Sequence, residues 1–135
     1  MTSDRLARAY LEKATIRLKA LKFLHQERGY SDVVREAQEC VEILLKGVLR
    51  CIGIEVPKIH DVSRLLKQWT DLLPQILREN LDEISRISRE LRKDRELAFY
   101  GTEDWIPTEE YSEQDSLEAI RKAERVFEIV SQVIR

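Results

Sequence analysis

The chain has few of the residues that interrupt helices and few of those that bind metals. Its 135 residues include only four glycines, three prolines, two cysteines and two histidines. So few helix-breaking residues favour long helices over many short strands. The histidines, His25 and His60, lie in different segments, and no cysteine–histidine cluster has the spacing of metal ligands. We therefore expect no metal and no cofactor.

Signatures of several protein classes are also missing. The sequence contains no serine-hydrolase elbow, no Walker loop and no glycine fingerprint for dinucleotides. Cys40 and Cys51 fall within one predicted helix, about 16 Å apart, which is too far for a disulfide bond between them. The charged N-terminus lacks an apolar signal segment, and no apolar run approaches the roughly 20 residues of a membrane helix. The sequence predicts a cytoplasmic protein.

Apolar residues recur at three- and four-residue spacing along most of the chain. This periodicity predicts an all-α fold, an antiparallel up-and-down bundle of about five helices that forms one domain over residues 1–135. Ser31, Asp61 and Ser112 are expected to cap the second, third and last helices. The predicted helices cover, in order, residues 4–28, 32–52, 61–72, 74–99 and 113–134.

The charges are unevenly distributed, although the net charge is only -2. The molecule as a whole should not attract nucleic acid. Five cations, however, crowd one segment of the fourth predicted helix, and seven acidic residues follow within residues 103–118. A solvated face with local ion pairs is the simpler interpretation of this pattern. The cations of the segment are Arg86, Arg89, Arg92, Lys93 and Arg95.

The end of the fourth predicted helix carries the best candidates for a binding site. Arg92, Arg95 and Phe99 are separated by three and four residues and should share a helix face. Arginine suits phosphate binding because its planar guanidinium donates two parallel hydrogen bonds. Tyr100 stands at the helix end, where its side chain can project into a cleft. On the residues alone, pairing of the arginines with neighbouring carboxylates is the favoured alternative.

Three stretches of the chain resemble the HEPN domain family of small helical bundles. Residues 37–47, Ala-Gln-Glu-Cys-Val-Glu-Ile-Leu-Leu-Lys-Gly, are similar to the family pattern Ala-Gln-x-x-x-Glu-x-x-x-Lys. Residues 56–62, Val-Pro-Lys-Ile-His-Asp-Val, resemble its Pro-x-x-His-Asp stretch. The segment from Arg95 to Tyr100 falls where the family has its Arg-x(4–6)-His motif. Together, in this order and spacing, these stretches extend the resemblance over nearly the whole chain.

The resemblance implies a metal-independent ribonuclease in which the RNA 2′-hydroxyl attacks the adjacent phosphate in a cleft at a dimer interface. Arg95 would hold the scissile phosphate and stabilise the developing charge, and Arg89 and Arg92 would add phosphate or RNA contacts. Tyr100 stands in place of the family's histidine. A tyrosine has a pKa near 10 and is a poor general base at neutral pH, so whether the chain is an enzyme is open and only weak cleavage is expected.

The spacing of the two motif residues bears on assembly. Five residues of helix correspond to a rotation of about 140°, so Arg95 and Tyr100 do not share a face of a straight helix. They converge if the helix distorts near Gly101 or if two chains contribute across a two-fold axis. Because the resemblance implies a dimeric cleft, we expect a homodimer that uses the fourth helix.

The resemblance also implies a partner protein. Many HEPN proteins form a toxin–antitoxin pair with a minimal nucleotidyltransferase, and some of these enzymes attach nucleotides to a tyrosine near the motif. The usual target position is occupied here by Thr102, and Tyr100 is a nearby candidate. The main alternative is a non-catalytic helical protein–protein interaction module, which the acidic net charge and the missing motif histidine favour.

Overall fold

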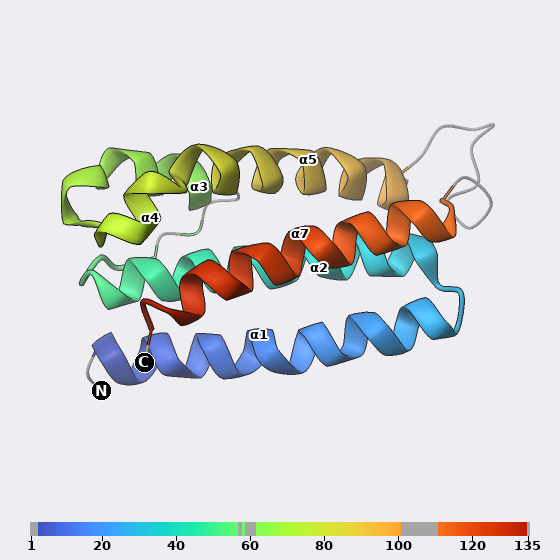
Figure 1. Ribbon diagram of the computed structural model, residues 1–135, viewed down its shortest axis with the longest axis horizontal. Coiled ribbons are helices and arrows are strands. Elements are labelled where there is room, and N and C mark those ends of the chain that lie inside the picture. The colour runs from blue at the N-terminus through green and yellow to red at the C-terminus, as the bar shows by residue number, and fades with distance from the viewer. Residues whose placement is uncertain (1–2, 57, 59–61, 101–110, 135) are drawn as a thin grey trace.

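The computed structural model describes residues 3–56, 58, 62–100 and 111–134, with only the backbone described at residue 3 and residues 95–100 (Figure 1). Every regular element within these ranges is helical, which confirms the predicted all-α class. The long helices are α1 (Ser3–Gln26), α2 (Tyr30–Cys51), α5 (Leu81–Tyr100) and α7 (Glu113–Ser131), and the short elements are α3 (Val62–Gln68), the 3-10 turn η1 (Thr70–Leu72) and α4 (Gln75–Glu79).

The four long helices form an antiparallel up-and-down bundle (Figure 1). α2 is the central element, because it packs against α1, α5, α7 and α3. In Figure 1, α1 lies at one edge of the bundle and α5 at the opposite edge, with α2 and α7 between them. The molecule therefore has two edge helices, each with an outer face that no other described helix covers.

The core is aliphatic and continuous. In α1, Ala7, Ala14 and Leu21 follow one another at seven-residue spacing and are at most 1% exposed. Gly47 in α2 allows close packing at this interface: a Cβ atom there would lie 3.2 Å from the Cβ of Tyr10 and 3.0 Å from the Cδ1 of Ile134. Burial of such apolar surface is the main source of stability in the bundle.

The single helix predicted over residues 74–99 is divided in two. α4 ends at Glu79, Asn80 follows as a C-cap, and α5 begins at Leu81. The Asn80 Nδ2 donates a hydrogen bond of 2.7 Å to the Ile76 carbonyl oxygen, which closes α4, while the Asn80 carbonyl accepts from the Ile84 amide to open α5. The prediction was wrong here because apolar spacing continues undisturbed across the break.

The third predicted helix is also divided, into α3 and η1. Its expected cap, Asp61, lies outside the described residues. The expected cap Ser31 is wrong, since α2 begins one residue earlier, at Tyr30, and Ser31 is buried within its first turn. The expected cap Ser112 is confirmed: its Oγ accepts a hydrogen bond of 3.1 Å from the Asp115 amide, and Asp115 bonds back to the Ser112 amide. Such a capping box satisfies amides that a helix start leaves unpaired.

Both cysteines are free thiols. Cys40 is buried and Cys51 is half-buried. Burial raises the pKa of the Cys40 thiol to about 12, so it remains protonated and behaves as a small apolar side chain. None of the helices in the described ranges is both long and apolar enough to cross a membrane.

Candidate nucleic-acid interface

The candidate residues named from the sequence all lie on α5. Arg89 is exposed and Arg92 is half-buried, and their three-residue spacing places them on the same side of the helix. The side chains of Arg95 and Tyr100 lie outside the described residues, although the helical backbone continues through both positions. α5 thus brings Arg89 and Arg92 together and places the motif positions on its last turns.

Two acidic residues of α5, Glu83 and Glu90, contact basic residues of α7. Arg125 of α7 contacts Glu83, with its Nε 3.1 Å and its Nη2 3.0 Å from Oε1. Lys122 contacts Glu90 at 2.8 Å, and this hydrogen bond lowers the pKa of the Glu90 carboxyl. The two contacts clamp α5 onto α7 along one side of the helix.

The arginines of α5 differ in their contacts. Arg86 shares Glu90 with Lys122, at 3.9 Å. Arg89 makes no ion pair with any residue that the structure describes. The exposed Arg89 guanidinium can therefore bind an incoming anion. The ion-pair alternative for Arg95 stays a prediction, because its side chain lies outside the described residues.

A small polar cavity of about 130 Å³ lies next to the last turns of α5. The hydroxyl of Tyr111 donates a hydrogen bond of 2.5 Å to the backbone carbonyl of Asp94, the residue before Arg95. Burial, followed by the charges of Asp94 and Asp115, raises the pKa of Tyr111 to about 12. The hydroxyl therefore stays a donor and ties the chain before α7 to the end of α5. The cavity is lined by Asp94, Tyr111 and Asp115, together with Val34, Glu118, Ala119 and Lys122.

The Asp94 carboxyl lies partly buried in the same region. Burial raises the pKa of this carboxyl, and the attraction of Lys122 opposes that rise less strongly. Ionisation of Asp94 in this position therefore lowers the free energy of unfolding. Sequence reasoning missed both Asp94 and Tyr111, because the hydrogen bond that joins their segments spans 17 residues and has no local signature.

The residues that carry the Ala-Gln-x-x-x-Glu-x-x-x-Lys pattern form a polar ladder along α2. The Gln38 Nε2 lies 3.4 Å from the Glu42 Oε2, and the Lys46 Nζ lies 3.6 Å from the Glu42 Oε1. Gln38 is only 5% exposed, and α2 packs directly against α5. The four-residue spacing of these side chains was the sequence signal for the ladder. The pattern thus has a structural basis in the central helix.

The described part of the chain contains no group of three or more histidine, cysteine or acidic residues arranged to hold an ion. The His25 Nδ1 lies 2.8 Å from the Ser116 Oγ, and its Nε2 lies 3.9 Å from the Glu113 Oε1. His25 therefore links α1 to α7. His60, in the Pro-x-x-His-Asp stretch, lies outside the described residues.

Comparison with known proteins agrees with this arrangement. The model of the HEPN domain family matches residues 7–133. The chain belongs to the HEPN domain family. This HEPN protein is also similar to a protein of Methanocaldococcus jannaschii named "Putative toxin MJ1304", with 27% identity over 135 residues, covering 96% of this chain and 88% of that protein. No solved structure matches the chain.

Proposed function

We propose that this HEPN protein is a component of a toxin–antitoxin pair that binds RNA or a nucleotide phosphate through arginines in the C-terminal half of α5. The proposal assigns phosphate binding to Arg89, Arg92 and Arg95. Its main support is the family match over residues 7–133, together with a relative that is named a toxin. The exposure of Arg89, which makes no ion pair with a described residue, supports it further.

The proposed chemistry needs no metal. The 2′-hydroxyl of the RNA gives its proton to a solvent water while its oxygen attacks the adjacent phosphorus, the bond to the 5′-oxygen breaks, and a 2′,3′-cyclic phosphate forms. Arg95 stabilises the negative charge that develops on the phosphate oxygens. Tyr100, which is protonated at neutral pH, can donate a proton to the leaving 5′-oxygen but cannot efficiently accept one from the 2′-hydroxyl. Cleavage should therefore be slow.

The proposed site is shared by two chains. α5 is helical through Tyr100, so the backbone positions of Arg95 and Tyr100 remain about 140° apart around the helix axis. A two-fold axis at the end of α5 would bring Arg95 of one chain beside Tyr100 of the other. Arg95 follows the buried Leu91 by four residues and the buried Ser88 by seven, so such a contact is proposed at the C-terminal end of α5 rather than along its outer side. The proposed homodimer uses this end of α5.

The proposed partner is a minimal nucleotidyltransferase. In such a pair, the partner would silence the HEPN protein by attaching a nucleotide near its motif, at Tyr100 or Thr102. Mass spectrometry of this chain after incubation with a co-encoded nucleotidyltransferase and a nucleoside triphosphate tests this assignment. The assignment predicts an adduct that is lost in Tyr100→Phe or in Thr102→Val.

Fluorescence anisotropy with a labelled single-stranded RNA tests phosphate binding. Arg95→Ala and Arg89→Ala should each weaken binding by about 10-fold or more, since a charge-assisted hydrogen bond is worth about 1.5–3 kcal/mol. Arg121→Ala is the matched control, because Arg121 is an exposed cation on α7. The proposal fails if the wild-type protein binds neither RNA nor a nucleotide, or if Arg95→Ala binds as tightly as Arg121→Ala.

A further inference from the structure

The outer face of α1 carries an exposed apolar stripe, here called the α1 stripe, formed by Ala9, Ile16, Ala20 and Phe23. Ile16 is 66% exposed and Phe23 is 60% exposed, and both alanines are exposed. At 100° per residue, the four positions fall within about 60° of one another around the axis. α1 is an edge helix, and none of the described helices covers this face (Figure 1). Large apolar side chains gathered in this way mark an interaction surface.

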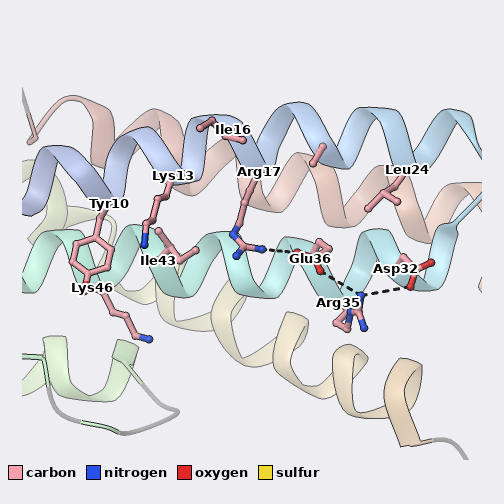
Figure 2. Close-up of a pocket in the computed structure, with 11 residues that line it drawn as sticks. Tyr10, Lys13, Ile16, Arg17, Leu24, Asp32, Arg35, Glu36, Ile43 and Lys46 are labelled. Carbon is pink, nitrogen blue, oxygen red and sulfur yellow. Dashed lines mark hydrogen bonds and ion pairs between the residues drawn. The ribbon is translucent and has the colours of Figure 1, made fainter.

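A groove of about 780 Å³ between α1 and α2 borders the α1 stripe (Figure 2). Ile16 and Ala20 line it, together with Tyr10, Leu24 and Ile43. Its floor is therefore mainly apolar and continues the surface of the stripe. The groove and the stripe share Ile16 and Ala20 and so form one continuous surface.

The charges in the groove do not favour a nucleic acid there. Figure 2 shows Arg17 reaching across the groove to Glu36, with its Nη1 2.7 Å from Oε2. Arg35 contacts Asp32 at 3.8 Å and Glu36 at 3.4 Å. Both arginines of the groove are thus already paired with carboxylates, which leaves little free positive charge for a phosphate backbone. An apolar surface with mixed charges suits a protein partner.

Two exposed charges flank the α1 stripe symmetrically. Lys13 precedes Ala20 by seven residues, and Glu27 follows it by seven, directly after the last residue of α1. The Glu27 amide still bonds to the Phe23 carbonyl as in a helix, so each lies about 10.5 Å from Ala20 along the helix axis. Within the described residues, neither Lys13 nor Glu27 takes part in an ion pair. The two charges are opposite in sign and equally distant from a small residue. A second copy of this surface, rotated by 180° about an axis through Ala20, therefore places its Glu27 opposite Lys13 and its Lys13 opposite Glu27.

From this symmetry we propose that a second copy of this chain packs antiparallel on the α1 stripe, with a two-fold axis passing close to Ala20. The two Ala20 residues face each other, and their small size lets the helices approach closely. Ile16 of one chain packs near Phe23 of the other, and Lys13 of one chain meets Glu27 of the other. The same patch is used by both chains, as a two-fold interface requires.

This interface does not depend on the proposed function. α1 and α5 lie at opposite edges of the bundle, so the proposed contact through α5 and the contact through α1 do not compete for the same surface (Figure 1). A protein that uses only α1 would be a dimer. A protein that uses both edges would form a longer assembly, because two-fold contacts at opposite edges leave a free edge at each end. Loss of the α1 interface should leave monomers in the first case and dimers joined through α5 in the second.

Charge reversal gives a test with an internal rescue. Light scattering coupled to size-exclusion chromatography should show that Lys13→Glu and Glu27→Lys each lower the mass of the assembly, because each places like charges opposite one another. The double variant should recover the wild-type mass, since the pair is restored with its signs exchanged. Lys67→Glu is the matched control, because Lys67 is an exposed cation on α3, which packs against α2 and α5. It should leave the mass unchanged.

Cysteine cross-linking tests the position of the axis. Ala20→Cys should give a covalent dimer under oxidising conditions, because the two residues face each other across the axis. Gln26→Cys should not, because two such residues would be about 18 Å apart along the helices, beyond the reach of a disulfide bond. The wild-type protein controls for Cys40 and Cys51, and circular dichroism verifies that each variant is helical.

Three results would overturn the proposal. One is an unchanged mass for both single charge reversals and for Ile16→Glu, all of them correctly folded. Another is equal cross-linking of Ala20→Cys and Gln26→Cys. The third is that Ile16→Glu abolishes binding of a different protein while self-association is unaffected, which would assign the α1 stripe to that protein instead.

Discussion

His25 and Ser116 are 91 positions apart in the sequence, yet the His25 Nδ1 lies 2.8 Å from the Ser116 Oγ. The contact joins the last turn of α1 to the first turn of α7. Ser116 is fully buried, and the His25 side chain is 19% exposed. Polar groups in such positions depend on each other, because removing one leaves the other without its partner. The bond therefore fixes one end of α1 against α7.

Replacement of Ser116 by alanine should destabilise the protein through this bond. We expect the free energy of unfolding to fall by about 1–2 kcal/mol, because the partly buried His25 ring loses its partner. Thermal denaturation should show a midpoint lower by a few degrees. Ser131→Ala is the control, since the Ser131 hydroxyl is exposed and bonds to the Glu128 carbonyl of its own helix. Equal midpoints for the two variants would contradict the role given to Ser116.

Asp94→Asn should stabilise the protein at neutral pH. Burial raises the pKa of the Asp94 carboxyl above its ordinary value of 3.8, so the ionised form costs stability in the folded state. The cost appears as the pH rises through 3.8 towards the folded pKa, and it is absent below 3.8. Urea denaturation at about pH 7 and about pH 3 should show a gain for Asp94→Asn only at the higher pH.

Glu90→Gln is a contrasting variant on the same helix. Lys122 lowers the pKa of Glu90 below its ordinary value of 4.5, so the ionised form stabilises the folded state. That contribution is present above 4.5 and is lost as the pH falls through the folded pKa. Glu90→Gln should therefore weaken the protein at about pH 7 and match the wild type in strong acid. The same sign of change in both variants at neutral pH would refute the electrostatic account of α5.

Tyr100→His should increase RNA cleavage. A histidine titrates near neutral pH and can both accept and donate protons, so a gain on the order of 10² in rate is expected. The gained activity should depend on pH with a midpoint near 6.5 and should resist chelating agents. Tyr100→Phe, which lacks a group that can exchange protons, should show no gain. An unchanged rate in a dimeric, folded Tyr100→His protein would argue against catalysis at this position.

A mixture of two inactive variants tests the shared site. If Arg95 and Tyr100 of one site come from different chains, a dimer of one Arg95→Ala chain and one Tyr100→Phe chain retains one intact site. Random mixing makes half of the dimers mixed, so about a quarter of the wild-type sites should return. If both residues come from one chain, every site lacks either Arg95 or the Tyr100 hydroxyl, and the mixture stays inactive. Single-turnover cleavage of a labelled RNA distinguishes the two outcomes.

The helical class and the four long helices could be predicted because their signals are local. Apolar spacing placed α1, α2, α5 and α7, and Ser112 acted as the expected cap because its partner Asp115 is only three residues away. The break at Asn80 could not be predicted in the same way. The Asn80 side chain is held by Arg125, 45 residues further along the chain, at 3.3 Å.

The candidate site was predictable only in part, for a related reason. Arg89 and Arg92 lie on α5 as expected from their spacing. The contacts that define their surroundings connect distant segments, as between Glu90 and Lys122 or between Asp94 and Tyr111. Such contacts depend on how the helices pack, and local periodicity does not contain that information. The role of the side chains of Arg95 and Tyr100 remains a prediction.

The central position of α2 has a consequence for the opening motions of the molecule. Its backbone amides are shielded by α1, α5, α7 and α3, whereas α1 and α5 each have a face towards solvent. Amide hydrogens in the middle of α2 should therefore exchange with deuterium only through global unfolding, while those on the edge helices exchange through smaller openings. Both surfaces to which we assign binding partners thus lie on the helices that can loosen without loss of the fold.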